Sequence, residues 1–313
     1  MSSSIAPAMA PSAMPLTLDV LGIGLWADGL GDWTSAVSAW SGVPVAPEAV
    51  RAKPQALLLP PAERRRAPAT VAVAMDVADQ ACRMAGVPPS RLRSVFCSAL
   101  GDMAITDYLC RTLAESPEHL SPIKFHHSVH NAASGYWTIG VGNHAASMAM
   151  AAGGETFAQG LLEAASQALC EDSPVLLVAY DMASPLPLDA LTGSHLLAGV
   201  ALVLAPPGEK ETAQPALAQL CVSLVADPAP GTGPLMAPPL AHLMVPATPA
   251  PIANPQAPAW PLMQALARLS GPLAGNGAPA NWSGSMRLTS GLRLQLALEG
   301  ALHGPPQDSC GGG

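Results

Sequence analysis

Residues 147–181 read SMAMAAGGETFAQGLLEAASQALCEDSPVLLVAYD, and they decide the fold that the sequence predicts. Residues 147–154 are small and apolar and end in two glycines, a pattern typical of a short strand that runs into a glycine turn. Residues 155–170 repeat apolar positions at helical spacing and predict a long helix. The apolar run 174–181 predicts a buried central strand. A strand, a helix and a strand in this order indicate a layered α/β unit.

Similar signals occur on both sides of this stretch. Apolar runs predict strands at 16–26 and 94–101, and two neighbouring runs, 196–206 and 216–226, predict an antiparallel pair. Helical spacing that ends at Gly or Pro predicts helices at 32–42, 63–86, 105–116 and 260–270. Residues 135–142 are apolar but interrupted by glycine, which indicates a helical or irregular segment. Alternation in 285–298 predicts one more strand. Together these segments predict an α/β fold with a layered mixed sheet.

Proline and glycine divide the chain into regions. The 34 prolines and 28 glycines crowd into the first 60 residues and into 205–280, which indicates connections rather than regular elements there. We expect one main domain and four flanking regions. These are a disordered lead (1–15), the domain (16–226), a Pro/Ala-rich linker (227–258), a helix plus a strand that complete the domain (259–300) and a flexible tail (301–313).

Composition excludes several functional classes. The net charge of the 313 residues is −8, which argues against nucleic acid as the main partner. The six cysteines show neither a CxxC pair nor the spacing of metal ligands. The N-terminus lacks the positive region of a secretory signal. Residues 125–154 carry no Lys, Arg, Asp or Glu, but their His, Asn and Gly content argues against a membrane span. We expect a cytoplasmic protein with no metal, cofactor or membrane span.

The spacing of four residues upstream of the glycine turn carries a resemblance to a known family. Asn131, Gly135, Gly142 and Ser147 precede the short strand, the helix and the central strand without a gap. This frame resembles the N-terminal half of the β-ketoacyl synthases, which have the thiolase fold. In that family the short strand ends in a nucleophilic cysteine that opens the long helix. The resemblance places this cysteine position on Gly154.

A thiol at that position would be activated by its surroundings. The N-terminus of a helix favours the thiolate, which is the form that accepts an acyl group. Gly154 has no side chain, so no acyl-enzyme can form there. Cys170 lies at the wrong end of the helix, and Cys97 is expected to pack within a strand. Glu155 complements the helix dipole or, alternatively, mimics a bound acid or serves in decarboxylation.

We expect the second half of the ketosynthase fold to be absent here, because the remaining 130 residues are too few and too Pro-rich to form it. The family uses two further histidines in a Gly/Thr-rich loop and in a later turn, but only His242 and His303 follow residue 200, and neither has such a context. An alternative use of histidine is the cluster HHSVHN (126–131). His126 and His130 have the spacing of zinc ligands on a helix, and Ser128 could serve a hydrolase, although neither a carboxylate partner nor a GxSxG elbow is present.

Longer segments resemble the short chain-length-factor type of ketosynthase-like protein found in aryl polyene and related polyketide systems. These segments are LPPAERRRA (59–67), SALGDMAITDYL (98–109), SPIKFHHSVHNAASGYWTIGVGN (121–143) and GGETFAQGLLEAASQAL (153–169). The resemblance implies a pseudoenzyme that is a subunit of a 3-oxoacyl synthase complex in polyketide or fatty-acid-like biosynthesis. Its implied partners are a catalytic ketosynthase, as a heterodimer, and an acyl carrier protein. The alternative is an independent acyl-carrier decarboxylase or hydrolase.

The family-like frame also suggests which residues meet the partners. The candidates for the interface or for the tunnel that holds the growing chain are the large or polar residues near the short strand: Met103, Tyr108, His130, Asn131, Tyr136, Trp137, Met148 and Met150. Ordinary core packing is the alternative for them. The one basic run is Arg64, Arg65 and Arg66, which either lies on a solvated helix or docks an acidic carrier protein.

Overall fold

The computed structural model describes residues 14–43, 45, 50–208, 214–227, 253–270 and 281–300. The strands in these ranges are β1 Leu16–Ala27, β2 Gly31–Asp32, β3 Arg93–Cys97, β4 Ser147–Met150, β5 Val175–Asp181, β6 Ala198–Ala205, β7 Ala218–Ala226, β8 Asn281–Thr289 and β9 Leu292–Gly300. The α-helices are α1 Trp33–Trp40, α2 Pro61–Arg66, α3 Ala69–Ala85, α4 Met103–Glu115, α5 Pro122–His127, α6 Ala132–Gly140, α7 Thr156–Cys170, α8 Asp189–Thr192 and α9 Trp260–Ser270.

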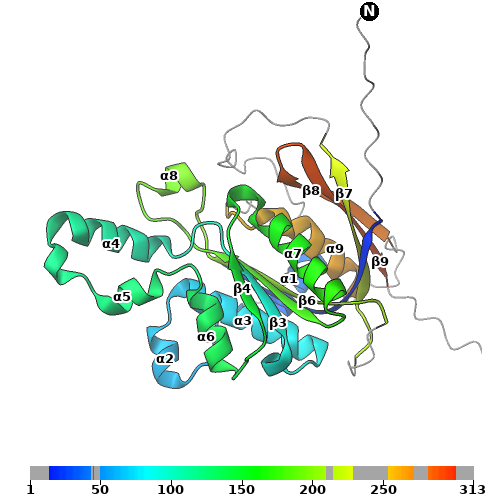
Figure 1. The fold of residues 1–313 in the computed structure, drawn as a ribbon, viewed down its shortest axis with the longest axis horizontal. Coiled ribbons are helices and arrows are strands. Elements are labelled where there is room, and N and C mark those ends of the chain that lie inside the picture. Colours follow the sequence, from blue (N-terminus) through cyan, green and yellow to red (C-terminus); the bar gives the residue numbers. More distant parts are fainter. Residues whose placement is uncertain are drawn as a thin grey trace, which may run out of the picture.

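The described strands form a single mixed sheet in the order β4–β3–β5–β6–β1–β7–β9–β8, and β2 also pairs with β1. The pairs β3–β4 and β3–β5 are parallel, whereas β5–β6, β1–β6, β1–β7, β7–β9 and β8–β9 are antiparallel. Helices lie on both faces of the sheet (Figure 1). The fold is therefore the layered mixed α/β fold that the sequence predicts.

Alternate residues of the central strands supply two separate cores. On β5, Val175, Leu177 and Ala179 belong to the core beneath α1, α7 and α9. Leu176, Val178 and Tyr180 belong to the core beneath α3 and α6. Because both faces are covered, β5 and β6 are buried along their whole length. This explains why these segments are continuously apolar rather than alternating in the sequence.

Two glycines of β1 allow α3 to lie directly on the sheet. A β-carbon at Gly22 would collide with the carbonyl oxygen of Ala81, and one at Gly24 would collide with the carbonyl oxygen of Val77. The helix therefore packs its backbone, not only its side chains, against β1. Alanine and valine on this face of α3 are completely buried, which is consistent with the close approach.

The structure corrects three expectations about the elements. The strands β6 and β7 are not paired with each other, because β1 lies between them. The helix expected at 63–86 is two helices that are separated at Pro68, since proline supplies no backbone N–H to continue the first one. The single strand expected at 285–298 is the hairpin β8–β9, which turns at Ser290 and Gly291.

The structure describes only parts of the expected lead and linker and none of the expected tail. Most of the expected lead, nearly all of the linker and all of the tail lie outside the described residues. Residues 253–258 belong to the expected linker, yet Asn254 and Gln256 are completely buried. The packed C-terminal segment therefore begins earlier than residue 259. No helix in the described part of the chain is long and apolar enough to cross a membrane.

The close contact between β1 and α3 gives a stability prediction. We expect Gly24→Ala to lower the free energy of unfolding by about 1–3 kcal/mol, because the new methyl group must displace the backbone of α3. The control is Gly135→Ala, since that glycine is helical and has open space where a β-carbon would lie. The control should be neutral or stabilising by about 0.4–1 kcal/mol. Urea denaturation of both variants measures the difference, and equal effects would contradict the packing argument.

Candidate functional site

The strand β4 forms one open edge of the sheet. Among the described strands it pairs only with β3, through the parallel register that places Ser94 opposite Ser147. Ser147 and Met148 are exposed, and Met148 retains 41% of its surface. An edge strand presents unpaired backbone N–H and C=O groups that can bind another strand. The edge is short, and side chains on both of its faces are accessible.

A tight turn connects β4 to α7. The 3-10 turn η4 spans Gly153–Glu155, and Gly153 has a φ of +56°, a conformation that favours glycine. The hydroxyl of Thr156 holds the turn: its oxygen accepts a hydrogen bond from the backbone N–H of Ala152 at 2.9 Å and donates to the carbonyl of Gly153 at 2.7 Å. Gly154 lies in the middle of this turn. It therefore stands between the end of the edge strand and the N-terminus of a 15-residue helix.

The cysteines near the turn are not accessible nucleophiles. The side chain of Cys97 at the end of β3 is completely buried, and it lies where a β-carbon on Gly160 would be. Burial, with a smaller contribution from the charge of Asp181, raises the pKa of the Cys97 thiol far above its usual value. Cys170 is the last residue of α7, at the end away from the turn. The expected packing of Cys97 within a strand is confirmed.

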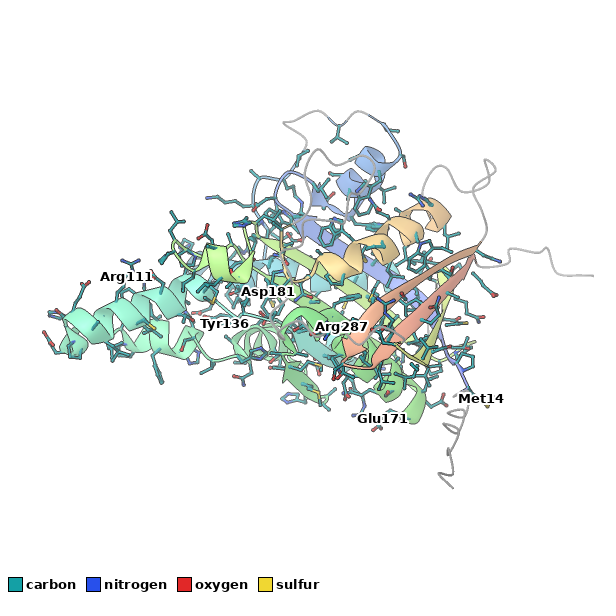
Figure 2. All side chains as sticks on the ribbon, turned by 90° about the horizontal axis from the view of Figure 1, so that it is seen from above. Met14, Arg111, Tyr136, Glu171, Asp181 and Arg287 are labelled. Atoms are coloured by element: carbon teal, nitrogen blue, oxygen red, sulfur yellow. The ribbon has the colours of Figure 1, made fainter. Side chains whose placement is uncertain are left out.

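A buried carboxylate lies where β3 and β5 end. Asp181 accepts hydrogen bonds from the Ser98 hydroxyl (2.8 Å), from the backbone N–H groups of Ala99 and Leu100 (3.0 Å each) and from the Gln256 amide (2.6 Å). It is completely buried, and burial raises its pKa although the four donors favour the ionised form. Figure 2 shows Asp181 within the body of the molecule, whereas Arg111 lies out on the projecting lobe of α4 and α5.

The same network joins the C-terminal segment to this lobe. The Asn254 amide donates to the backbone carbonyls of Asp181 (3.0 Å) and Leu196 (2.9 Å). The His130 ring nitrogen Nε2 lies 2.9 Å from the carbonyl of Ser98. Asp102 caps α4 by accepting from the N–H of Ile105. These contacts determine how the chain leaves the sheet and enters α4.

The histidines of 126–131 are used in structural contacts. The Nε2 atom of His127 lies 2.9 Å from the Tyr136 hydroxyl, and burial together with His126 lowers the pKa of His127. Helix α5 ends at His127, so His126 and His130 do not share a helical face as the zinc alternative requires. Among the described residues no cluster of His, Cys, Asp and Glu could hold a metal ion.

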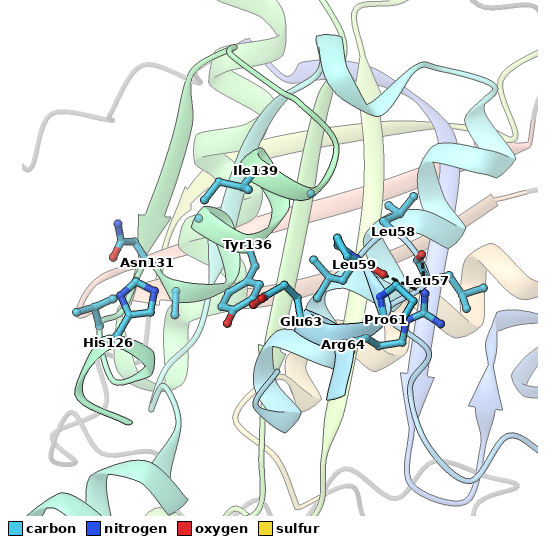
Figure 3. Close-up of a pocket in the computed structure, with 15 residues that line it drawn as sticks. Leu57, Leu58, Leu59, Pro61, Glu63, Arg64, His126, Asn131, Tyr136 and Ile139 are labelled. Atoms are coloured by element: carbon cyan, nitrogen blue, oxygen red, sulfur yellow. Dashed lines mark hydrogen bonds between the residues drawn. The ribbon is translucent and has the colours of Figure 1, made fainter. Parts of the chain in front are cut away.

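A cavity of about 690 Å³ lies between the segment that leads into α2 and the helices α5 and α6. Figure 3 shows Tyr136 and Glu63 facing each other across it. Burial and the charge of Glu63 both raise the pKa of Tyr136. The lining is mainly apolar: Leu57, Leu58, Leu59, Pro60, Pro61, Glu63, Arg64, His126, Val129, Asn131, Ala132, Gly135, Tyr136, Ile139 and Gly140.

The sequence model of the beta-ketoacyl synthase N-terminal domain matches residues 37–229, a range that includes the open edge, the turn and α7. The chain belongs to this family. A search of curated proteins finds no match to this ketosynthase-family chain.

Solved structures share the fold of this ketosynthase-family chain. The ketosynthase ApeO in complex with its chain length factor ApeC from Xenorhabdus doucetiae gives a TM-score of 0.59 at 21% identity, covering 90% of this chain and 98% of that one. The ishigamide ketosynthase/chain length factor gives 0.62 at 13%, covering 91% and 99%. The type II complex AntDE:AntF, an acyl-carrier protein with its ketosynthase, gives 0.65 at 12%, covering 92% and 100%. At these identities the likeness shows the fold.

The residues that the sequence predicts for the interface or tunnel have different environments in the structure. Trp137 is completely buried in the core beneath α3, next to Phe96, and is ordinary core. Tyr136 and Asn131 line the cavity. Met148 lies exposed on the open edge, and Met150 packs partly against the core beneath α7. Met103 and Tyr108 are half-buried on α4, and His130 is exposed beside its contact with Ser98.

The three arginines of the basic run on α2, residues 64–66, also differ in their contacts. Arg64 donates from Nη2 to the carbonyls of Leu57 (3.2 Å) and Leu59 (3.0 Å), so it stabilises the segment that precedes α2. Arg65 and Arg66 are exposed, and their docking role stays a prediction. Sequence reasoning missed Asp181 and Gln256. A charged residue at the end of an apolar run was a usable signal for Asp181, whereas a glutamine in a Pro/Ala-rich segment carries none.

The buried network gives a second prediction. Asp181→Asn should lower the free energy of unfolding by about 2 kcal/mol at neutral pH, because an amide N–H2 then faces backbone donors that need an acceptor. Hydrogen exchange should also become faster in α4 and α5. The control is Asp107→Asn on the surface of α4, where loss of the pair with Arg111 should cost less than about 0.5 kcal/mol.

The pH dependence gives an independent readout of the same variant. Because the folded state raises the pKa of Asp181, the folded protein binds more protons than the unfolded chain. The contribution of this group to stability therefore decreases as pH rises above about 4. The difference in unfolding free energy between wild type and Asp181→Asn should follow this trend. A difference that is constant with pH would contradict the direction of the shift.

Proposed function

We propose that this chain is a non-catalytic ketosynthase-like subunit, a chain-length factor, that pairs with a catalytic β-ketoacyl synthase. The observation that carries the proposal is Gly154, which lies in the turn between β4 and α7 where the family's nucleophile is expected. Acyl transfer needs a thiolate at that point, and glycine supplies no reactive atom. The system served is aryl polyene, other polyketide or fatty-acid-like biosynthesis.

The accessible surface near β4 supports a protein partner. Large apolar side chains are exposed on β4 (Met148), on its neighbour α6 (Ile139, 85%) and on α5 of the lobe (Phe125, 64%). Exposed apolar residues beside an open strand edge are a liability in a monomer and are suited to a protein interface. A strand from the partner would satisfy the free backbone groups of β4, and the apolar side chains would be covered at the same time.

The chemistry identifies the kind of partner. A chain without the nucleophile needs a second subunit that supplies it, and an interface at β4 would bring the glycine turn of this chain close to the nucleophile turn of the partner. Chain length factors of this fold are found in complex with a ketosynthase. In this proposal the apolar cavity beside Tyr136 and the half-buried Met103 and Tyr108 lie on the side of the lobe that bounds the growing chain. An acyl carrier protein is the second partner, with Arg65 and Arg66 as its docking residues.

The open edge gives a binding prediction. Met148→Lys should abolish or weaken by at least about tenfold the co-purification of the chain with its partner ketosynthase, since a charge would be buried in the interface. Leu224→Lys is the matched control, because Leu224 on β7 is 40% exposed and Met148 is 41% exposed. Co-expression followed by size-exclusion chromatography measures the complex. Equal loss in both variants, or a chain that stays monomeric beside the ketosynthase, contradicts the proposal.

The glycine turn gives a catalytic prediction. Gly154→Cys should not produce condensing activity with acyl-carrier and malonyl-carrier substrates, because a thiol alone lacks the histidines of the second half of the fold. The measurement is product formation by the isolated variant and by the isolated wild-type chain, with the ketosynthase complex as positive control. Condensation by the variant would contradict the proposal of a non-catalytic subunit. Turnover of acyl-carrier substrates by the wild-type chain alone would favour the independent decarboxylase or hydrolase instead.

A further inference from the structure

The C-terminal hairpin β8–β9 meets the glycine turn at two adjacent points. Arg287 on β8 lies with its Nε atom 3.3 Å from the Oε1 atom of Glu155. The amide of Gln159 donates a hydrogen bond of 2.7 Å to the carbonyl of Leu288. Glu155 and Gln159 are four residues apart and lie on the same side of α7. The first turn of the helix therefore contacts the end of the hairpin with two side chains.

A bulge in the hairpin makes the second contact possible. The register of β8 and β9 pairs Arg287 with Arg293 and Thr289 with Leu292, so Leu288 is the extra residue of a β-bulge. A bulged residue is left out of the ladder, and its carbonyl is free to accept from another element. Gln159 uses this carbonyl. The bulge is thus the local feature that directs the hairpin backbone toward α7.

The register also creates an electrostatic conflict. Arg287 and Arg293 are directly opposite each other on β8 and β9, and like charges in that position destabilise a strand pair. Each arginine lies beside a carboxylate from another segment: Arg287 beside Glu155, and Arg293 beside Asp227 at 3.4 Å. Neither Nε atom makes a hydrogen bond of good geometry. The two arginines are therefore stabilised mainly by electrostatic attraction to these carboxylates in a partly buried environment.

Apolar packing holds the adjoining residues of β8, because Met286 and Leu288 are buried in the core beneath α7 (6% and 4% exposed), but this packing is incomplete beside the turn. A cavity of about 290 Å³ lies between the turn and the end of β8, lined by Ala152, Gly153, Glu155, Gln159, Leu288 and Thr289. Apolar contact is therefore incomplete where the two elements meet. Glu155 retains 13% of its side-chain surface and Arg287 retains 29%, so the pair is only partly screened by water.

We propose that Glu155 and Gln159 form a clasp that holds the C-terminal hairpin against the turn, and that the former acyl site has become its anchor. The description of the turn as a former acyl site rests on the proposed function, because it takes the turn to be a nucleophile position that was lost. The clasp itself does not depend on the proposed function. The role of Glu155 is then to neutralise Arg287 beside Arg293. It follows that the hairpin end stands next to the C-terminal end of β4 and belongs to the surface that a ketosynthase bound at β4 would meet.

The test measures hydrogen exchange of the β8 and β9 amides in the isolated full chain. Glu155→Gln should accelerate this exchange about fivefold, because it leaves two arginines facing each other with one carboxylate. Arg287→Gln should have a smaller effect, since it removes the repulsion between Arg287 and Arg293 together with the attraction between Arg287 and Glu155. The double variant Glu155→Gln/Arg287→Gln should exchange more slowly than Glu155→Gln alone.

The control variant is Glu171→Gln, which removes the ion pair of Glu171 with Arg93 (2.8 Å) at the other end of α7. It should leave exchange in the hairpin unchanged. The clasp is refuted if Glu155→Gln leaves exchange in the hairpin unchanged, or if adding Arg287→Gln to Glu155→Gln does not slow that exchange. Either result is expected for a glutamate that only complements the helix dipole. Co-purification with the ketosynthase is a separate measurement. A failed heterodimer with a confirmed clasp would therefore overturn only the proposed function.

Discussion

The carboxylate of Asp181 is the charge around which the ends of the sheet are organised. Among the described residues no cation is paired with it, and it accepts hydrogen bonds from two segments that are distant in sequence, residues 98–100 and Gln256. Leaving any of these donors unpaired in the interior would be costly, so the end of β5, the residues after β3 and the segment around Gln256 are constrained together. The projecting lobe follows from the second of these, because the chain enters α4 directly after it.

Much of the fold can be predicted from the sequence because local patterns determine it. The buried strands β1 and β5 and the helix α7 are strongly apolar or strongly periodic, and they lie close to the expected limits. The pairing of β6 and β7 was wrong for a physical reason. Neighbouring strands usually pair, and nothing local shows that the N-terminal strand inserts between them. The turn at Ser290 and Gly291 was missed because alternation continues on both sides of it.

The candidate site was predictable to the extent that it depends on short-range spacing. The position of Gly154 between a strand and a helix follows from the local pattern. Long-range contacts were not predictable. Trp137 and Tyr136 are adjacent aromatic residues in one Gly-rich segment, yet the first is core and the second lines a cavity. Arg287 and Glu155 are 132 positions apart, and only the folded sheet brings their charges together.

The central position of β1 has a consequence for how the protein is made. Of the described strands β1 is the first in the chain, but both of its main neighbours, β6 and β7, are synthesised only after residue 197. Until then β1 can pair only with the two residues of β2 and pack against helices that are made earlier, α1, α3 and α7. Such non-local pairing makes folding slow and exposes the chain to aggregation. The yield of folded protein should therefore depend on the time that the ribosome takes to pass from β1 to β7.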